Sequence, residues 1–566
     1  MRIDLRAKPF CLDNEAIAWV ERTRDALTTE EKVGQLFCVL FKQAVPSELK
    51  YVLNILKPGG CMYRVVPAER AIGFTNQLRE ALDIPPLIAA NLEKGGNGIV
   101  EEGTLLGSPM EIAATDDVEM ASKMAEVCGA EGRAVGANWA FAPIIDIDSN
   151  FRSPITNTRT FGSDPARVRE MGAAYTRKIQ EMGFAASIKH FPGDGQDERD
   201  QHLVTTINSM DCETWMETYG AVYKAGIEAG ALTCMVGHIM QPAWSKRLNP
   251  SLADRDILPA SLSKELMQGL LRGELGFNGM IVTDATTMAG YTIPMSRWLA
   301  VPSSIAAGAD MFLFARNLEE DYGFMLEGVR SGIITPERLD EAVTRVLATK
   351  AALGLHRRQT PLDPAQAETV IGCEKHLQWS RECADRAITL VKEEQEVLPI
   401  TPERYPRILF YPIEPPAGGE GNYKVKAACD MLKERLEREG FHVDTFVPQP
   451  YGEGFTTKYE DMVQSYDLML YAANLSTKSN QTVVRIEWKQ PMGADCGHYL
   501  NDVPTVFISL ENPYHLLDFP RVRTYINCYS NNDRILDALV EKLTGRSPFT
   551  GKSPVDPFCG RWDTRL

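Results

Sequence analysis

The segment GFAASIKHF, residues 183–191, is an apolar run that opens with a glycine and ends near the polar pair Lys189 and His190. Its apolar residues do not alternate with polar ones, which is typical of a strand buried on both faces, as in a parallel sheet. Helical patterns lie between runs of this kind, as at 67–82 and 168–182. Seven further runs occupy 33–41, 59–63, 86–93, 138–148, 231–239, 279–288 and 308–316. Eight strand-then-helix units predict an N-terminal (β/α)8 barrel of the TIM type, and an open doubly wound sheet is the alternative.

A second, smaller domain is predicted after the barrel. The sequence predicts a catalytic barrel over 1–355, a linker with two prolines and mixed charge over 356–373, and an α/β sandwich domain over 374–566. The stretch 374–404 is predicted to be helical and ends in VLPI. New apolar runs follow at 407–413, 442–448, 466–474, 505–512 and 525–531, with helices predicted at 425–441 and 533–545. This alternation predicts a parallel or mixed sheet between helices.

The composition narrows the classes of partner. The chain has 566 residues, and its 60 Lys and Arg against 76 Asp and Glu give a net charge of −16. An acidic chain gains little from counterion release, so neither nucleic acid nor an anionic membrane is expected as a partner. The charged N-terminus lacks the apolar core of a signal peptide, and no run of about 18 apolar residues occurs. The 12 cysteines form no Cys-x-x-Cys pair, so we expect a cytoplasmic protein. The sequence leaves the oligomeric state open, and a homodimer is one possibility.

Polar side chains follow the predicted barrel strands, where a barrel carries its active site. In chain order they are Asn91, Glu93, Asp146, Asp148, Asn157, Arg159, Lys189, His190, Asp200, His202, His238 and Asp284. Three of the eight histidines fall between residues 190 and 238. We interpret this cluster as the main sign of a functional site.

Three kinds of site fit such residues. A metal site is disfavoured because no His-x-His or His-x-x-x-His pair is present. Glycines at 95–98 (GGNG) and 192–195 (PGDG) could hold a phosphate, but neither stretch is a P-loop, and such glycines more often serve turn geometry. Sugar chemistry needs one carboxylate facing the anomeric carbon and one proton donor near the leaving oxygen. Asp284, at the end of the apolar run MIVT, suits the first role, and a helix N-cap is its structural alternative.

Asp200 and His202 suit the role of proton donor. They lie two residues apart in a polar loop after the fifth predicted strand. A carboxylate beside an imidazole fixes the tautomer of the ring and favours its protonated form, which makes histidine a general acid near neutral pH. The alternative is an exposed loop with unrelated charges.

The stretch KHFPGDGQDERDQH (189–202) closely resembles the signature of glycoside hydrolase family 3, in its β-N-acetylglucosaminidase branch. In that branch Lys-His-Phe-Pro-Gly opens a loop that ends in Asp-Ser/Thr-His. Further matching stretches lie, in the family's order, at 27–37, 132–148, 157–165, 276–288, 386–400 and 549–558. The resemblance therefore covers nearly the whole chain.

The resemblance implies a role for each matching residue. Asp284 stands at the position of the catalytic nucleophile, His202 at the acid/base of this branch, and Asp200 at its partner. The substrate-binding residues implied are Lys189, His190, Arg159, Asn91, His238 and Asn157. The loop with the Asp-His pair is treated in the family as mobile, closing over the substrate. The implied ligand is a small carbohydrate, and no metal or organic cofactor is implied.

Some residues depart from the family pattern. In NLEKGG (91–96), Asn91 replaces a family Asp that holds sugar hydroxyls, and Lys94 is inserted; Gln201 replaces Ser or Thr between Asp200 and His202. The implied function is a retaining exo-β-glycosidase that hydrolyses terminal β-linked N-acetylglucosamine or a related sugar. Three alternatives stay open: a phosphorylase that uses phosphate as acceptor, an enzyme of β-glucosidase specificity, and a catalytically weak sugar-binding homologue.

Overall fold

The computed structural model describes residues 3–45, 49–357, 359–415, 427–447, 458–475, 479–480, 482, 484–490 and 493–566. The chain divides into two compact units. The first comprises Met1–Leu106, Ala121–Ser153 and Pro165–Leu377, and the second comprises Gly107–Met120, Pro154–Asp164 and Gln378–Leu566. Two short segments from the N-terminal half of the chain therefore belong to the second unit.

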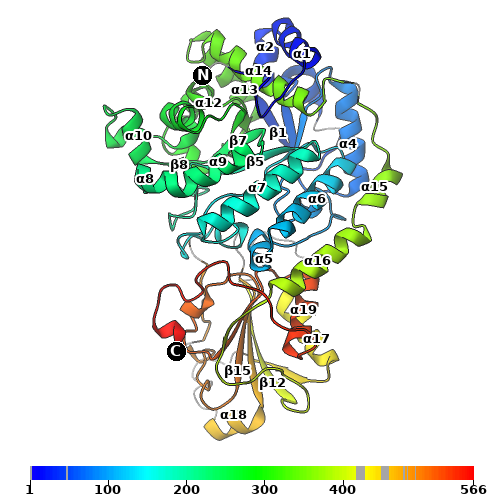
Figure 1. Cartoon of the computed structure of the whole chain (residues 1–566), viewed down its shortest axis with the longest axis vertical. Helices are drawn as coiled ribbons and strands as arrows, with labels where there is room; N and C mark the ends of the chain where they lie inside the picture. The colour runs from blue at the N-terminus through cyan, green and yellow to red at the C-terminus, as the bar shows by residue number, and fades with distance from the viewer. Residues whose placement is uncertain are drawn as a thin grey trace. The chain divides into compact units, whose positions relative to one another are not determined.

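Eight parallel strands form the sheet of the first unit (Figure 1). Their order is β10–β1–β2–β3–β4–β5–β7–β9. An isolated parallel bridge between Val282 in β9 and Met311, directly before β10, makes the barrel nearly closed. The strands are β1 (Phe37–Phe41), β2 (Gly60–Tyr63), β3 (Leu87–Ala90), β4 (Trp139–Ala140), β5 (Ala185–Phe191), β7 (Thr233–Val236), β9 (Met280–Thr283) and β10 (Phe312–Leu313). Each lies within one of the eight predicted runs, which confirms the (β/α)8 barrel.

The barrel strands are buried on both faces, as their unbroken apolar runs predict. Every residue of β2, β3, β5, β7 and β9 is buried. A short parallel pair, β6 (Thr206–Ile207) and β8 (Ile239–Met240), follows β5 and β7 in the chain. This pair carries the loop after β5 to the segment after β7, where several of the candidate residues lie.

Helices alternate with the barrel strands along the chain. They are α1 (Asn14–Ala26), α2 (Thr29–Gln35), α3 (Leu49–Tyr51), η2 (Val52–Leu56), α4 (Ala68–Ala81), η3 (Gly96–Gly98), α5 (Pro109–Ala114), α6 (Val118–Ala134), η4 (Asn157–Arg159), α7 (Pro165–Glu181), α8 (Cys212–Trp215), η5 (Met216–Gly220), α9 (Ala221–Glu228), α10 (Pro242–Leu248), η6 (Asp254–Asp256), η7 (Ala260–Leu262), η8 (Glu265–Glu274), α11 (Ala289–Thr292), α12 (Arg297–Ala307), α13 (Leu318–Arg330) and α14 (Pro336–Ala352). Some of these helices begin at a capping residue that the sequence shows. For example, Thr28 and Glu31 form a capping box that begins α2.

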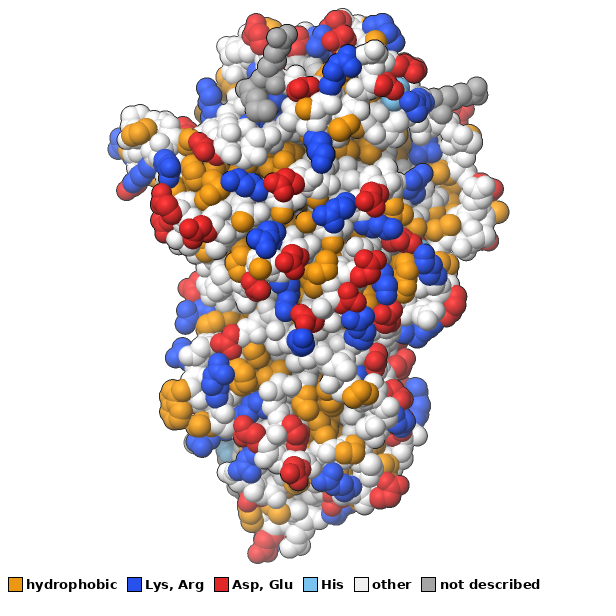
Figure 2. All heavy atoms as spheres, viewed as in Figure 1, with side chains coloured by type: hydrophobic (Ala, Val, Ile, Leu, Met, Phe, Trp, Pro, Cys, Tyr) orange, Lys and Arg blue, Asp and Glu red, His pale blue; other side chains and the backbone are white. Residues whose placement is uncertain are grey.

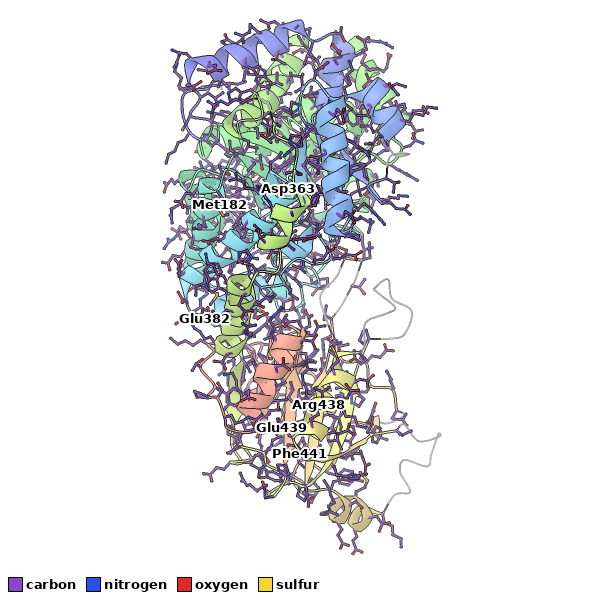
Figure 3. The ribbon with its side chains drawn as sticks, turned by 90° about the vertical axis from the view of Figure 1, so that its right-hand side faces the viewer. Met182, Asp363, Glu382, Arg438, Glu439 and Phe441 are labelled. Atoms are coloured by element: carbon purple, nitrogen blue, oxygen red, sulfur yellow. The ribbon has the colours of Figure 1, made fainter. Side chains whose placement is uncertain are left out.

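The stretch 356–373, predicted to be a linker, contains a short helix, α15 (Pro364–Val370). Asp363, labelled in Figure 3, caps it by accepting a hydrogen bond from the Ala365 N–H at 3.0 Å. Pro364 at the first helical position suits a helix start, since its missing N–H would have no partner there.

A six-stranded mixed sheet forms the second unit, in the order β11–β16–β15–β14–β12–β13. The strands are β11 (Thr389–Glu393), β12 (Arg407–Ile413), β13 (His442–Thr445), β14 (Leu468–Ala473), β15 (Thr505–Ser509) and β16 (Thr524–Asn527); only β11 pairs antiparallel in this set. The helices are α16 (Glu374–Ala387), α17 (Ala428–Arg438), α18 (Tyr459–Ser465), η11 (His515–Leu517), α19 (Asp533–Leu543) and η12 (Asp563–Arg565). The smaller α/β domain is confirmed; residues 425–426 and 448 of the predicted elements lie outside the described residues.

One predicted helix is wrong in its second half. The sequence predicts a helical stretch over 374–404, but α16 ends at Ala387 and β11 begins at Thr389. Ile388, Thr389 and Val391 are β-branched, which favours an extended backbone beside a sheet edge. The pairing of β11 with β16 then decides the conformation, and this pairing is not visible in the local pattern.

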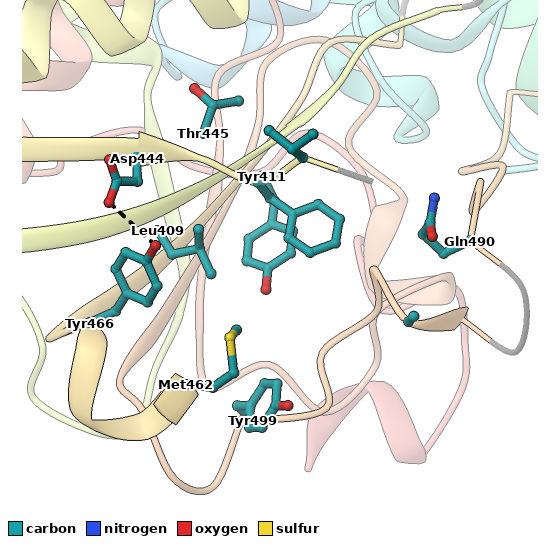
Figure 4. Close-up of a pocket in the computed structure, with 11 residues that line it drawn as sticks. Leu409, Tyr411, Asp444, Thr445, Met462, Tyr466, Gln490 and Tyr499 are labelled. Carbon is teal, nitrogen blue, oxygen red and sulfur yellow. Dashed lines mark hydrogen bonds between the residues drawn. The ribbon is translucent and has the colours of Figure 1, made fainter. Parts of the chain in front are cut away.

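Side chains of the second sheet alternate between two apolar clusters. On β12, Ile408 and Phe410 pack in the cluster that includes α17 and α19, whereas Leu409 and Tyr411 pack in the other. The second cluster contains a row of stacked rings, with Tyr411 and Tyr471 4.2 Å apart between centroids. A cavity of about 340 Å³ opens beside Tyr411 (Figure 4).

The surface mixes both signs of charge. On the face seen in Figure 2, acidic and basic side chains are interspersed over the molecule. In the part of the chain that the structure describes, no helix has the length and apolarity needed to cross a lipid bilayer.

Candidate active site

Asp284 is held directly after strand β9 and is 7% exposed. Its backbone N–H donates to the carbonyl of Val236 in the neighbouring strand β7 at 2.9 Å. The N–H of Ala285 donates to Oδ1 of Asp284 at 2.7 Å. The backbone of Asp284 is therefore tied to a barrel strand, and its carboxylate is oriented by the N–H of the next residue.

The electrostatic surroundings of Asp284 favour its ionised form. Burial is the largest single influence on its pKa and acts to raise it. The histidines His190, His238 and His202 act in the opposite direction, helped by the Ala285 hydrogen bond, and together they lower the pKa below its usual range. Asp284 is thus a buried, charged carboxylate, as a nucleophile must be.

His190 lies between Asp284 and a second carboxylate, Asp146. Its Nδ1 is 2.7 Å from Oδ2 of Asp146, and its backbone N–H donates to Oδ1 of the same carboxylate at 3.0 Å. The other ring nitrogen, Nε2, lies 3.9 Å from Oδ2 of Asp284. Since a carboxylate acts only as an acceptor, Asp146 fixes the proton on Nδ1 and thereby orients the ring.

Lys189, next to His190 on β5, forms an ion pair with Glu93 after β3. Its Nζ lies 2.7 Å from Oε1 of Glu93, and its side chain is 4% exposed. Asn91, directly after β3, is exposed. The structure thus brings Lys189, His190 and Asn91 to the carboxyl ends of the barrel strands, and their contacts with a sugar remain a prediction.

The Asp200–His202 pair is formed as the sequence predicts. Nδ1 of His202 lies 2.6 Å from Oδ1 of Asp200, and the same oxygen accepts a hydrogen bond from the His202 backbone N–H at 2.9 Å. Asp200 is buried, while the imidazole of His202 keeps about a fifth of its surface exposed. The ring is therefore oriented on one edge and accessible on another.

The loop that carries this pair rests on helix α11, which follows Asp284 in the chain. The N–H of Ala289 donates to the carbonyl of His202 at 3.0 Å, and the N–H of Gly290 donates to the carbonyl of Gln201 at 3.2 Å. A Cβ on Gly290 would lie 2.5 Å from that Gln201 oxygen. The close approach of loop and helix therefore depends on a glycine at 290.

His238 is fully buried, and both of its ring nitrogens have protein partners. Nε2 lies 3.1 Å from the carbonyl oxygen of Ala285, and Nδ1 lies 2.9 Å from Oγ of Ser261. Burial lowers the pKa of His238, although the nearby Asp284 acts against this change. The Ala285 carbonyl can only accept, so Nε2 of His238 donates to it. His238 thus holds the backbone of the residue after Asp284, and the substrate contact that the family resemblance implies for it stays a prediction.

Asn157 and Arg159 lie in the short helix η4, within the segment Pro154–Asp164 of the second unit. Nδ2 of Asn157 donates to Oδ1 of Asn512 at 3.1 Å, and Arg159 donates from Nη1 to the Ile155 carbonyl at 3.3 Å. Their predicted contacts with the substrate stay a prediction.

The arrangement in the barrel suits a two-step substitution at carbon. It joins a buried ionised carboxylate, Asp284, to an accessible imidazole, His202, whose tautomer is set by Asp200. Among the described residues, no group of three or more His, Cys, Asp and Glu side chains is arranged to hold a metal ion. The sequence did not reveal the roles of Gln201, Ser261 and Gly290, because their contacts come from segments distant in the chain.

Comparison with known proteins identifies the family. Residues 28–349 match the model of the glycosyl hydrolase family 3 N-terminal domain. A protein of Cellulomonas fimi named beta-N-acetylglucosaminidase/beta-glucosidase is 52% identical over 564 residues, covering 100% of both chains.

Two solved structures are also similar. One, named beta-glucoside phosphorylase BglX, has a TM-score of 0.93 and 46% identity and covers 99% of each chain. The other, a glycoside hydrolase family 3 beta-N-acetylglucosaminidase from Paenibacillus sp. str. FPU-7, has a TM-score of 0.77 and 25% identity over 94% of this chain and 99% of that one. The order of motifs along the barrel, its topology and these full-length matches agree: this chain is an enzyme of glycoside hydrolase family 3.

Proposed function

We propose that this enzyme is a retaining exo-β-glycosidase that acts on terminal β-linked glucose or N-acetylglucosamine. The observation that carries the proposal is the pairing of a buried ionised carboxylate, Asp284, with the Asp200–His202 pair on the adjoining loop. The name of the Cellulomonas fimi relative supports both sugars as candidates.

In the first step, Asp284 attacks the anomeric carbon of the sugar. A bond forms between its carboxylate oxygen and that carbon, while the glycosidic bond breaks and its electron pair goes to the leaving oxygen. Nε2 of His202 gives its proton to that oxygen, since Nδ1 is held by Asp200. The sugar is left bound covalently to Asp284, and His202 is left neutral.

In the second step, the bond to Asp284 is broken by an incoming acceptor. When the acceptor is water, neutral His202 takes its proton at Nε2 and returns to the state in which the cycle began. Two inversions at the anomeric carbon retain the β configuration. Both steps are thus assigned to groups that this chain itself supplies.

Phosphate is the second candidate for the acceptor. Two points support it. A structural relative with 46% identity is named a phosphorylase, and the proposed acid/base is an imidazole, which is neutral after the first step. A carboxylate in the same place would be negative at that moment and would repel an incoming phosphate dianion. An imidazole carries no such penalty.

The experiment that tests both candidates is a product analysis. The enzyme is incubated with nitrophenyl β-glucoside and nitrophenyl β-N-acetylglucosaminide, with and without inorganic phosphate, and the products are resolved by NMR. Hydrolysis gives free sugar that is first formed as the β anomer, and phosphorolysis gives a sugar 1-phosphate. Release of the α anomer would contradict the retaining mechanism for either acceptor.

A further inference from the structure

The side chain of Gln201 connects the loop of the acid/base to the surroundings of the nucleophile. Although Gln201 stands between Asp200 and His202 in a polar loop, it is only 1% exposed. Its Oε1 accepts a hydrogen bond from the backbone N–H of His238 at 2.8 Å. Its Nε2 donates to Oδ2 of Asp194 at 3.3 Å. The buried amide therefore uses one acceptor and one donor, each on a different segment.

One of these segments leads to His190. The backbone N–H of Asp194 donates to Oδ1 of Asp146 at 2.8 Å, and that carboxylate also holds Nδ1 of His190. The Nε2 of His190 then faces Asp284 at 3.9 Å. A continuous line of contacts thus joins the Gln201 amide to the carboxylate of the nucleophile.

The other segment leads to the residue after the nucleophile. His238, whose N–H is bound by Gln201, holds the carbonyl of Ala285 through its ring. The side chain of Gln201 thus bonds to two segments that each lead to Asp284, one through Asp194 and one through His238.

The chemistry of the two partners explains why the residue is a glutamine. A backbone N–H requires an acceptor and a carboxylate requires a donor, and both must be supplied at the end of one long side chain. A glutamate would lack the donor and would place a second negative charge beside Asp194. A methionine would match the length of the chain and supply neither hydrogen bond.

We propose that Gln201 is a positioning residue that holds His202 at its proton-transfer position relative to Asp284. This inference rests on the proposed function, in which His202 is the general acid and base. Gln201 itself does not touch the reacting atoms, so its effect passes through the geometry of the loop. Small displacements of a proton donor reduce proton transfer strongly, while a substrate that needs no proton is indifferent to them.

The experiment compares two substrates in Gln201→Met. An alkyl β-glucoside has a poor leaving group, an alkoxide, which needs the proton of His202 to depart. A 2,4-dinitrophenyl β-glucoside has a good leaving group, a dinitrophenolate, which departs without that proton. The matched control is Gln241→Met, because buried Gln241 also accepts from a backbone N–H, that of Trp244 at 2.8 Å, and donates to the Met210 carbonyl at 2.6 Å.

We expect Gln201→Met to lower kcat/KM for the alkyl glucoside by about 10- to 100-fold and that for the dinitrophenyl glucoside by less than about threefold. With the dinitrophenyl substrate, kcat should fall and azide should restore it, since the slow step becomes attack by water without a positioned base. Gln241→Met should leave the ratio of the two kcat/KM values unchanged, even if it lowers the thermal midpoint of unfolding as much as Gln201→Met does.

Equal losses on the two substrates, or no loss on either, would overturn the inference. If Gln201→Met does not fold, Gln201→Asn carries the same test, because it keeps the amide but withdraws it by one methylene. His202→Ala is run in parallel. A selective loss in His202→Ala with none in the Gln201 variants contradicts only the role of Gln201, whereas no selectivity in His202→Ala contradicts the proposed function.

Discussion

Nδ1 of His202 lies 2.6 Å from Oδ1 of Asp200, an oxygen that also accepts the backbone N–H of His202. Because the carboxylate can only accept, the proton of a neutral His202 ring is held on Nδ1. In the proposed mechanism, Nε2 is then the nitrogen that exchanges protons with the substrate. The pair therefore has the two properties of an acid/base, a fixed orientation and one defined reactive nitrogen.

Replacing His202 should separate substrates by leaving group. His202→Ala should lower kcat/KM for an alkyl or sugar leaving group by ~10²–10⁴-fold, because no group then protonates the departing oxygen. Loss on a dinitrophenyl glycoside should be much smaller in kcat/KM. The covalent intermediate should accumulate and be seen as a burst, and azide should restore turnover with a β-glycosyl azide as product.

Asp200→Ala serves as the graded comparison for that variant. The imidazole remains, but it loses the partner that orients it, so the same selectivity should appear with a smaller magnitude. Equal losses on good and poor leaving groups, with no burst and no azide rescue, would show that His202 is not the acid/base.

Gly290 offers a second way to disturb the loop. A Cβ there would lie 2.5 Å from the Gln201 oxygen and 2.9 Å from that of Val204, so Gly290→Ala should push the loop away from helix α11. We expect a loss of kcat/KM of about tenfold or more on alkyl glycosides, with little change on dinitrophenyl ones. Gly323→Ala, in helix α13 with open space around it, is the control and should leave both values unchanged. Equal kcat/KM values for alkyl glycosides in Gly290→Ala and Gly323→Ala would mean that the position of the loop does not limit proton transfer.

Asn91 should influence the choice of sugar. It is exposed directly after β3, at the end of the barrel where the other candidate residues lie. Asn91→Asp should change the ratio of kcat/KM for N-acetylglucosaminide against glucoside, while unfolding free energy changes by no more than about 0.5 kcal/mol, as is usual for an exposed site. If the ratio is unchanged, Asn91 does not contact the sugar.

Lys350 should make stability depend on pH. It is fully buried, donates to the neutral Oε1 of Gln35 at 2.7 Å, and burial lowers its pKa from 10.5 to about 7. Since the unfolded chain binds this proton more tightly, the cost to the folded state is complete below about pH 7, falls as pH rises, and vanishes above about pH 10.5. Lys350→Met should therefore raise the free energy of unfolding by about 2 kcal/mol at pH 6, and by less at pH 9.

Lys542 provides the control for this measurement. It is also buried, but its ammonium is paired with Asp385 at 2.9 Å and donates to the Pro548 carbonyl. Lys542→Met should therefore destabilise the protein, because it removes the cation paired with Asp385 and the donor to the Pro548 carbonyl. A gain from Lys350→Met that is equal at both pH values would contradict the pKa assignment.

The sequence was most informative where a pattern is repeated. Strands of a parallel barrel are buried on both faces, so each is visible in the sequence as an apolar run. The polar residues that follow these runs lie at the carboxyl ends of the strands, where a barrel carries its active site. Asp284, His202 and Asp200 could be found in this way. Strand β11 could not, because Thr389–Glu393 becomes a strand only through its pairing with β16. Likewise, the burial of Gln201 and the enclosure of His238 depend on segments that the chain brings together only on folding.

The proposed mechanism requires Asp284 to become covalently bound to the sugar. The most direct measurement is to treat the enzyme with 2,4-dinitrophenyl 2-deoxy-2-fluoro-β-glucoside, digest it, and identify the modified peptide by mass spectrometry. The fluorine slows the second step, so the intermediate survives digestion. We predict one added fluorosugar per chain, located on Asp284, and no label in Asp284→Asn, whose turnover should fall by several orders of magnitude. A label on any other carboxylate, or near-normal turnover in Asp284→Asn, would show that Asp284 is not the nucleophile.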